Sequence, residues 1–216
     1  MTTDIVAFAR EKLELRAVPF VPEIRLYTAH AGSGLRRLLE AGLGPEDDDP
    51  PPPYWAYPWA GGAVLARYLL DHPETVRGKT VVDLGAGSGL VAIAAALAGA
   101  AAVTGVEIDA FGIAIMPLNA EANGVAVTPQ QADLLDGPPP DAEVLLAGDV
   151  FYAPEIAARV LPFLERCHAA GLTVLICDPR RAPLPLGRLV VRASYRVSDF
   201  GLGGAGDAPS AVFAFE

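Results

Sequence analysis

Five acidic residues are placed to do chemistry together, because each one follows a short apolar stretch typical of a buried strand. They are Asp83, Glu107, Asp133, Asp149 and Asp178. In open parallel sheets, ligands bind outside the carboxyl ends of the strands, near the point where the strand order reverses. A single acid at such a place is usually a solvated loop residue. Several acids on one edge of a sheet instead predict a site for a ligand with several polar groups.

A glycine-rich turn between the first of these strands and a helix narrows the kind of ligand. Gly85, Gly87 and Gly89 give the spacing G-x-G-x-G before an alanine- and leucine-rich stretch. Such glycines let a ligand approach the main chain, and amides at a helix start bind polar groups. The dinucleotide pattern G-x-G-x-x-G/A is not met, because Leu90 stands where its last small residue belongs, and no P-loop follows. Because Glu107 could accept from both hydroxyls of a ribose, we expect a cofactor that contains a nucleoside.

An aromatic segment, YWAYPW at 54–59, contains both tryptophans and two of the six tyrosines, and Gly61 and Gly62 follow it closely. Aromatic clusters are most often part of a core. This segment must lie near the glycine turn, however, so it could also wall a pocket for a flat base or a methylene chain. We favour the pocket interpretation.

Metal and nucleophile chemistry have no support in the sequence. The histidines, His30, His72 and His168, are scattered without an H-E-x-x-H or comparable ligand spacing. Cys167 and Cys177 form no C-x-x-C pair, and no G-x-S-x-G elbow exists. We therefore predict no metal site and expect both cysteines to be inert buried thiols.

Strand-like and helix-like stretches alternate along most of the chain. The expected strands are 20–27, 81–84, 102–106, 125–128, 143–147, 172–177, 189–197 and 211–216, and the expected helices are 4–15, 35–43, 63–70, 90–97, 110–123 and 154–169. Pro117 and Pro162 should bend their helices. This alternation predicts an α/β fold with a mostly parallel sheet, helices on both faces, and an antiparallel pair formed by the last two strands.

The 216 residues fit one domain, which we place at 54–216, after an N-terminal helical and extended segment with a linker at 1–53. The stretch PEDDDPPPP at 45–53 is too polar and proline-rich to pack, so we expect a loop there. No apolar run is long enough to span a bilayer, and the N-terminus lacks the features of a signal peptide. We expect a cytoplasmic protein that does not bind membranes.

The net charge is −10, and the only basic doublets are Arg36-Arg37 and Arg180-Arg181. Proteins that bind nucleic acids normally present a basic patch to the phosphates, so this composition makes a nucleic-acid substrate unlikely. An acidic surface modestly favours a cationic substrate, such as a lysine side chain.

The motifs DLGAGSG at 83–89 and GVEID at 105–109 resemble motifs I and II of the class I S-adenosylmethionine (SAM) methyltransferases. Further segments, in preserved order and spacing, resemble the seven-β-strand protein-lysine methyltransferases and specifically the electron transfer flavoprotein beta-subunit lysine methyltransferases. They are PEIRL at 22–26, PYWAYPWAGG at 53–62, RYLLD at 67–71, VRGK at 76–79, GDVFY at 148–152 and DPR at 178–180. The chain departs from that family in having Ala60, where we expect proline after the tryptophan, and in a divergent C-terminal stretch.

The resemblance implies a Rossmann-like class I methyltransferase with a seven-stranded sheet and SAM as cofactor, leaving S-adenosylhomocysteine as product. The implied cofactor-binding residues are Trp59, Asp83, Gly85, Ala86, Gly87, Glu107, Ile108, Asp133 and Leu134. Asp83 would hold the methionine ammonium, directly or through water, and Glu107 would bind the ribose. Asp133 would accept from the adenine amino group, between the apolar walls Ile108 and Leu134.

The motif Asp149-x-x-Tyr152 is the most diagnostic element of the resemblance, and it implies that both residues are catalytic. Asp149 would attract and orient an acceptor lysine, and Phe151 and Tyr152 would line the channel for its aliphatic stem. A carboxylate raises the pKa of a neighbouring lysine, so Asp149 is not assigned as the general base. The structural alternative is that Asp149 caps the helix starting at Pro154 and that Tyr152 is a core residue.

We therefore predict a SAM-dependent protein-lysine N-methyltransferase acting on the electron transfer flavoprotein beta subunit or on a ribosomal protein. A small-molecule N-methyltransferase could use the same pocket, because a fold alone does not set the substrate. A base methyltransferase would need an N/D-P-P-Y type motif, and the chain has Gly148-Asp149-Val150-Phe151 at that place. A non-catalytic cofactor-binding protein would have no evident use for Asp149.

Overall fold

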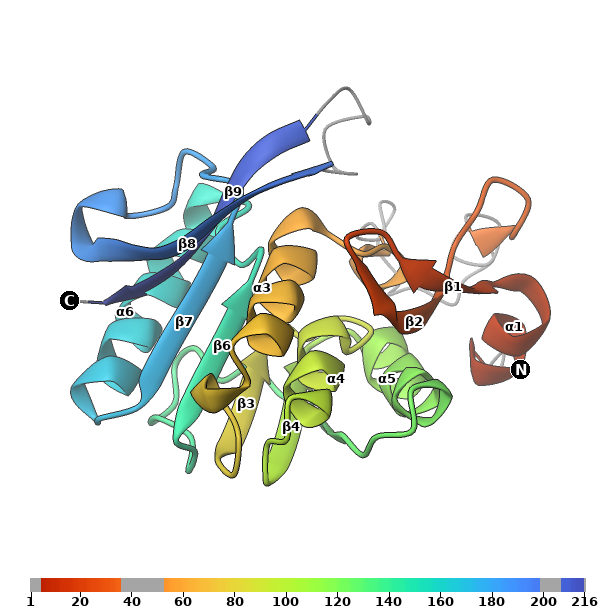
Figure 1. Cartoon of the computed structure of the whole chain (residues 1–216), viewed down its shortest axis with the longest axis horizontal. Coiled ribbons are helices and arrows are strands. Elements are labelled where there is room, and N and C mark those ends of the chain that lie inside the picture. Colours follow the sequence, from red (N-terminus) through yellow and green to blue (C-terminus); the bar gives the residue numbers. More distant parts are fainter. Residues whose placement is uncertain (1–4, 36–52, 199–206, 216) are drawn as a thin grey trace.

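The computed structural model describes residues 5–35, 53–198 and 207–215, and its centre is a seven-stranded sheet in the order β5-β4-β3-β6-β7-β9-β8 (Figure 1). The strands are β3 (Thr80–Leu84), β4 (Ala102–Glu107), β5 (Thr128–Gln131), β6 (Val144–Gly148), β7 (Thr173–Asp178), β8 (Leu189–Ser198) and β9 (Asp207–Phe215). The first five run parallel, and β9 pairs antiparallel with both β7 and β8. The predicted fold class is confirmed, including the antiparallel pair at the C-terminus.

Helices cover both faces of the sheet, because the strands are apolar on both sides. The helices are α1 (Ile5–Lys12), α3 (Ala60–Asp71), α4 (Leu90–Leu97), α5 (Ala110–Ala122) and α6 (Pro154–Ala169), with short 3₁₀ turns η2 (Tyr54–Ala56), η3 (Pro73–Thr75) and η4 (Leu186–Arg188). Val81 and Leu146 belong to the core cluster beneath α3 and α4, whereas Val82 and Leu145 belong to the cluster beneath α6. Continuous burial of successive residues is what parallel strands between two helical layers require.

The order of the strands reverses between β3 and β6. From β3 the chain moves outward through β4 to β5, and it then returns to place β6 on the other side of β3 and β7 beyond it. The residues that follow β3 and β6 therefore meet at the switch point, where sheets of this kind bind ligands. Asp83 and Leu84 at the end of β3 lie beside Leu146 and Ala147 in β6.

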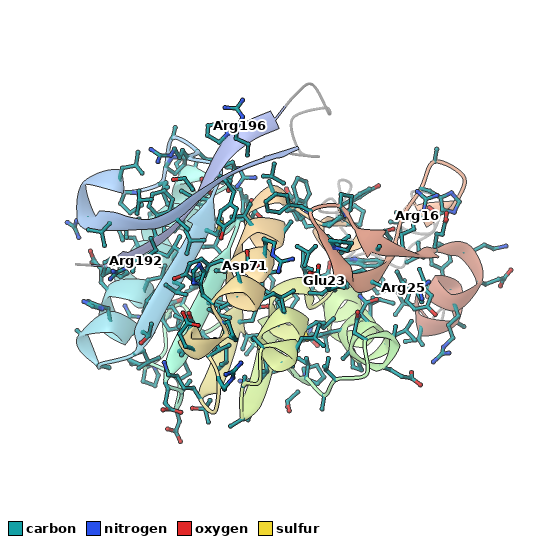
Figure 2. The ribbon with its side chains drawn as sticks, in the orientation of Figure 1. Arg16, Glu23, Arg25, Asp71, Arg192 and Arg196 are labelled. Atoms are coloured by element: carbon teal, nitrogen blue, oxygen red, sulfur yellow. The ribbon has the colours of Figure 1, made fainter. Side chains whose placement is uncertain are left out.

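An N-terminal hairpin of β1 (Glu14–Val18) and β2 (Val21–Thr28) forms a separate two-stranded sheet. The sequence predicted β2 but extended the first helix to residue 15, and that boundary is wrong because α1 ends at Lys12. The error has a simple cause, since β1 is exposed at most positions and lacks the apolar alternation that marks a strand. Glu23 of β2 and Asp71 of α3, both labelled in Figure 2, accept hydrogen bonds from Arg67.

Two further expectations need adjustment. The strand predicted at 125–128 lies instead at Thr128–Gln131, because this edge strand is exposed at all four positions, while the preceding valines pack against the core. Helix α3 begins at Ala60, so the paired glycines lie inside its first turn. Pro117 and Pro162 lie within α5 and α6, as expected. The predicted helix at 35–43 and most of the proline-rich loop at 45–53 lie outside the described residues.

Candidate active site

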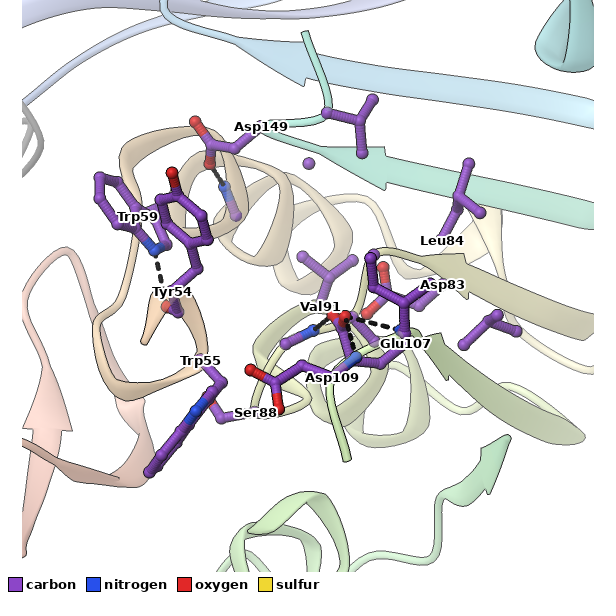
Figure 3. Close-up of a pocket in the computed structure, with 18 of the residues that line it drawn as sticks. Tyr54, Trp55, Trp59, Asp83, Leu84, Ser88, Val91, Glu107, Asp109 and Asp149 are labelled. Atoms are coloured by element: carbon purple, nitrogen blue, oxygen red, sulfur yellow. Dashed lines mark hydrogen bonds between the residues drawn. The ribbon is translucent and has the colours of Figure 1, made fainter. Parts of the chain in front are cut away.

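A pocket of about 940 Å³ lies at the carboxyl ends of the parallel strands, at the switch point (Figure 3). Every candidate site residue from the sequence lines it except Phe151: Trp59, Asp83, Gly85, Ala86, Gly87, Glu107, Ile108, Asp133, Leu134, Asp149 and Tyr152. Figure 3 shows Glu107 and Asp109 on one side and Tyr54 and Trp59 on the other, with Asp149 close to the aromatic pair. The pocket therefore has two chemically different ends.

The glycine turn uses backbone conformations that other residues rarely adopt. Gly85, Gly87 and Gly89 have φ angles of 68°, 53° and 92°. A β-carbon on Gly89 would lie 2.7 Å from Cγ of Met116, and this glycine forms the N-cap of α4. The G-x-G-x-G spacing is thus required both by backbone geometry and by close packing of the turn against α5.

Asp83 lies at the bottom of this turn and is only 1% exposed. Its carboxylate accepts a hydrogen bond of 2.9 Å from the backbone N–H of Ala92 in α4. Burial raises the pKa of the Asp83 carboxyl to about 8. Asp83 therefore fixes the start of α4 beneath the glycine turn. Any influence of Asp83 on the ammonium group of a bound ligand would act from beneath the pocket surface.

Glu107 and the glycine turn form one end of the pocket, which we call the cofactor-type end, and Glu107 binds three backbone N–H groups there. One carboxylate oxygen accepts from Gly87 at 2.8 Å, and the other accepts from Ile108 at 2.7 Å and Asp109 at 3.0 Å. The glycine turn and the end of β4 are thereby held together by one side chain. Ile108 is 67% exposed beside it and presents an apolar surface to the pocket.

Asp133 is held by a partner that the sequence did not indicate, Arg159 of α6. The guanidinium lies 2.8 Å from the Asp133 carboxylate and 2.7 Å from that of Asp136, and the backbone N–H of Leu135 donates to Asp133 at 3.0 Å. The bond from Arg159 lowers the pKa of Asp133. Asp133 therefore stays ionised, and each of its oxygens keeps a second lone pair for a donor on a ligand.

Asp149 follows β6 in a left-handed conformation, with a φ angle of 58°. One oxygen accepts from the N–H of Gly62 at 2.7 Å, and the other accepts from Arg181 at 2.7 Å. Burial raises the pKa of the Asp149 carboxyl to about 6, while the charge of Arg181 opposes that rise. The alternative in which Asp149 caps α6 is wrong, because Ala153 is the N-cap of that helix and no side chain caps it. Asp149 instead binds the start of α3.

The approach of α3 to Asp149 depends on a missing side chain. A β-carbon on Gly61 would lie 2.6 Å from the carbonyl oxygen of Cys177 and 2.7 Å from an Asp149 carboxylate oxygen. Glycine is therefore needed at position 61 for the helix to reach the carboxylate. The sequence contained this signal as the Gly61-Gly62 pair, but its reason is visible only in the packing.

Both predicted roles of the aromatic segment, a wall of the pocket and a part of the core, occur in different residues. The Tyr54 ring lies 5.6 Å, centroid to centroid, from both Trp59 and Tyr152, and the indole N–H of Trp59 donates to the Tyr54 carbonyl. These three rings form a wall of the pocket, which we call the aromatic wall. Trp55 is instead buried against Phe111.

Phe151 does not contribute to the pocket. Its side chain is fully buried in the core cluster beneath α6. The backbone after β6 places Asp149, Val150 and Tyr152 at the pocket, whereas Phe151 packs in the core. The sequence-based expectation that Phe151 lines a substrate channel is therefore not retained.

Arg181 is a site residue that the sequence analysis did not predict. It lies at the end of the pocket formed by Asp149 and the aromatic wall, which we call the acceptor-type end. It lines the pocket and contacts Asp149, and its guanidinium also lies 3.0 Å from the Asp178 carboxylate. The sequence showed only a basic doublet, and Arg180 turns the other way, over the ring of Phe213. The sequence signal that could have indicated Arg181 is its i to i+3 spacing from Asp178, because a tight turn brings such a pair together.

Two features are absent from the described ranges, a metal-binding cluster and a membrane-spanning helix. No group of three or more His, Cys, Asp or Glu side chains in this part of the chain is arranged to hold a metal ion. Among the helices of the same part, none combines the length and the apolar character that a membrane crossing requires.

Comparison with known proteins gives a consistent assignment. A family model described as ribosomal protein L11 methyltransferase (PrmA) matches residues 66–161. The chain is 40% identical over 152 residues to the electron transfer flavoprotein beta subunit lysine methyltransferase of Danio rerio, a match that covers 69% of this chain and 58% of that protein. It is 35% identical over 204 residues to the Homo sapiens protein of the same name, covering 92% of this chain and 75% of that one.

Solved structures support the fold at low sequence identity. The Pyrococcus horikoshii protein PH1948 superposes with a TM-score of 0.55 at 15% identity, over 85% of this chain and 98% of that one. Magnesium protoporphyrin IX methyltransferase from Synechocystis PCC 6803, solved with bound SAM, gives a TM-score of 0.51 at 16% identity, over 72% and 78% of the two chains. With the fold, the pocket and the long match to the human protein in agreement, the chain belongs to the family of the electron transfer flavoprotein beta subunit lysine methyltransferases.

Proposed function

We propose that this protein is a SAM-dependent protein-lysine N-methyltransferase. The observation that carries the proposal is that one pocket contains both a cofactor-type end and an acceptor-type end. The first is built by the glycine turn and Glu107, and the second by Asp149 and the aromatic wall. Methyl transfer requires donor and acceptor to be held in contact and in line, and a shared pocket supplies that arrangement.

The residues of the cofactor-type end fit the chemical parts of SAM. Glu107 can accept from a ribose hydroxyl through its one remaining lone pair, on the oxygen that binds Gly87, and Asp133 can accept from an adenine amino group. Ile108 and Leu134 offer apolar surface for the base, and we propose that Trp59, although part of the aromatic wall, also contacts the bound cofactor. When bound, SAM supplies a methyl group on a positively charged sulfur, which keeps the electron pair of the carbon–sulfur bond that breaks.

The acceptor-type end fits an amine on an aliphatic stem. A free lysine reaches its neutral, nucleophilic form at neutral pH at a cost of about 4–5 kcal/mol, so the site must favour loss of a proton. The partly apolar aromatic wall lowers that cost by desolvation, and Tyr54 and Tyr152 provide surfaces for the methylene chain. Asp149 attracts the cation and orients the nitrogen, and burial raises the pKa of the Tyr152 phenol, so this group remains a neutral hydrogen-bond partner.

The names of the relatives suggest the acceptors to test first. The relatives from Danio rerio and Homo sapiens are named for the electron transfer flavoprotein beta subunit, and the matching family model is named for ribosomal protein L11. We propose one of these two proteins, or a close counterpart, as the substrate. The formal charge of −10 suits a substrate whose target region is basic.

The test is transfer from tritiated SAM to purified electron transfer flavoprotein beta subunit, to ribosomal protein L11, and to a mixture of small amines, followed by mass spectrometry. The proposal predicts label on a lysine of one of the proteins, and loss of that label with the Asp149→Asn variant. Label confined to the small amines would replace it with small-molecule N-methylation. Label confined to RNA in a whole extract would contradict both.

A further inference from the structure

Arg181 joins two buried carboxylates beside the proposed acceptor site. One guanidinium nitrogen, Nη1, lies 2.7 Å from Oδ1 of Asp149 and 3.0 Å from Oδ2 of Asp178. The backbone N–H of Arg181 also donates to Oδ1 of Asp178 at 2.6 Å. Asp178 is fully buried, so it acts on the pocket through the arginine that it holds and through its charge, not through direct contact with a ligand. We call Asp149, Arg181 and Asp178 the charge triad.

The contacts show that Arg181 is built to remain in place when an acceptor arrives. The guanidinium is held by two carboxylates, and the backbone of the same residue is held by one of them. Withdrawing it would leave two buried carboxylates without a compensating charge, which is strongly destabilising. An incoming amine must therefore use the lone pairs of Asp149 that Gly62 and Arg181 leave open.

The other groups around Asp149 do not change its charge balance. Helix α3 contributes only backbone, the N–H of Gly62. Strand β7 contributes Cys177, and burial raises the pKa of that thiol well above its ordinary value, so the thiol is neutral. Tyr152, three residues along, is also neutral. The charges that act on Asp149 are thus the positive charge of Arg181 and the negative charge of Asp178.

The balance of charge around Asp149 affects two opposing requirements of the proposed reaction, binding of the ammonium form and loss of its proton. A carboxylate beside an acceptor attracts its ammonium form but also stabilises the proton that must leave before the nitrogen can attack. Two uncompensated carboxylates would hold that proton more firmly still. With Arg181 between them, the charge triad carries a single net negative charge, which is enough to attract a cation but opposes its deprotonation less.

We propose that Arg181 is a positioning residue for methyl transfer, which fixes the Asp149 carboxylate beside the acceptor and cancels one of the two neighbouring negative charges so that a bound ammonium can lose its proton. The inference rests on the proposed function for the identity of the acceptor. The fixing of Asp149 and the balance of charge around it are properties of this chain alone, and they can be measured without any acceptor.

The first experiment follows the Asp149 carboxyl by carbon-13 NMR titration in the whole protein, without an acceptor. Arg181→Met should raise the pKa of Asp149 by about one unit or more, since it removes an opposite charge in direct contact. Asp178→Asn should lower it, because a like charge is removed. The double variant Asp178→Asn/Arg181→Met should return close to wild type, and Arg180→Met, the same change at the neighbouring arginine, should have no effect.

The second experiment measures the pH profile of kcat, which reports ionisations in the enzyme–substrate complex, with the acceptor protein identified above. Arg181→Met should move the acidic limb of the profile to higher pH, with about a tenfold loss at pH 7 that recovers at alkaline pH. Asp178→Asn should move that limb to lower pH, and the double variant should restore it. Arg181→Lys keeps the charge and should leave the limb in place while lowering kcat, because lysine lacks the planar fork.

The outcomes separate the inference from the proposed function. An equal loss of rate at every pH with Arg181→Met, an unmoved titration of Asp149, and no rescue by the double variant would show that Arg181 only supports the fold. Should Arg181→Met fail to fold, the direction of the Asp178→Asn shift decides in its place. If wild-type protein methylates no protein at all, the proposed function fails, while the NMR titration still decides whether the charge triad is coupled.

Discussion

At the scale of single residues, the carboxylate of Asp149 supports the fold in addition to the chemical role proposed for it. It accepts from the start of α3 and from Arg181, and it faces the pocket with the lone pairs that remain. Its left-handed backbone is tolerated because aspartate adopts this conformation more readily than most residues. Strain and burial of this kind concentrate at functional sites, where surrounding contacts hold the residue in place.

Asp83 provides a prediction about stability and pH. Its carboxyl has a pKa of about 8 in the folded state because of burial, well above the value near 4 of an unfolded chain. Between these two values the folded state holds a proton that the unfolded state has lost. Stability from this group is therefore greatest at acidic pH and decreases as pH rises toward 8.

The measurement compares the melting temperature of wild type with that of Asp83→Asn from pH 5 to pH 8. The variant keeps an oxygen that can accept from Ala92 but has no proton to lose. We expect the difference between the two proteins to shift in favour of the variant as pH rises. A difference that is constant across this range would show that Asp83 ionises normally in the folded protein.

Partner residues explain what could and could not be predicted at this scale. The acids at the strand ends follow from the alternation of apolar stretches and turn residues, and eleven predicted site residues line the pocket. The arginines that bind these acids could not be predicted from the sequence. Whether Arg180 or Arg181 reaches the carboxylates depends on a turn in which Arg180 has a φ angle of 64°. The sequence pattern contains no information about such a local reversal.

At the scale of elements, the first turn of α3 is the part that completes the acceptor-type end. The N–H of Gly62 in this turn donates to Asp149, and two consecutive glycines, Gly61 and Gly62, lie at the contact. The two glycines are not equivalent, however. A β-carbon on Gly62 would meet only ordinary contacts, at 3.7 Å or more, whereas one on Gly61 would overlap two oxygens.

The pair Gly61→Ala and Gly62→Ala therefore forms a matched test. Gly61→Ala should lower the free energy of unfolding by about 1–3 kcal/mol, as overpacking of a tight contact does, and should weaken methyl transfer by displacing Asp149. Gly62→Ala should be neutral or stabilise by up to about 1 kcal/mol, because alanine favours helix. Urea unfolding of both variants checks this, and equal destabilisation would contradict the packing described.

Elements were predictable where burial imposes a pattern, and they were missed where it does not. Helix α6 has the predicted bounds, and β6 and β7 are shifted by a single residue. Strands β6 and β7 are buried between the two helical layers, and α6 packs against the sheet. Strands β1 and β5 are mostly or fully exposed, so their sequences carry no apolar alternation, and their positions are set by pairing with β2 and β4.

At the scale of the whole molecule, Asn119 connects parts of the chain that are far apart in sequence. This residue of α5 is fully buried, its side-chain oxygen accepts from the N–H of Tyr27 in β2, and its amide donates to the carbonyl of Ser88 in the glycine turn. The N-terminal hairpin is thereby coupled to the cofactor-type end. No sequence pattern indicates this connection, because it joins residues 92 and 31 positions away from Asn119.

Asn119→Ala should cost about 1–3 kcal/mol of unfolding free energy, since it leaves a buried N–H and a buried carbonyl unpaired. Amide hydrogen exchange at Tyr27 should become faster, together with exchange in the glycine turn. Asn123→Ala, which removes the bonds to Arg25 nearer the surface, serves as the control and should affect the hairpin without the turn. Unchanged exchange in the glycine turn of Asn119→Ala would show that the hairpin is not coupled to the pocket.

The proposed division of the pocket into a cofactor-type end and an acceptor-type end can be tested by measuring SAM binding and methyl transfer in two variants. Glu107→Ala should weaken SAM binding by about 100-fold or more, because a charge-assisted hydrogen bond to the ribose is lost together with the bonds that hold the glycine turn in place. Asp149→Asn should bind SAM within about threefold of wild type and yet lose transfer to the acceptor protein by about 100-fold. Calorimetry with SAM and single-turnover transfer by the same preparations would give both quantities. Equal loss of SAM binding in the two variants would contradict the account, because Asp149 would then belong to the cofactor-type end.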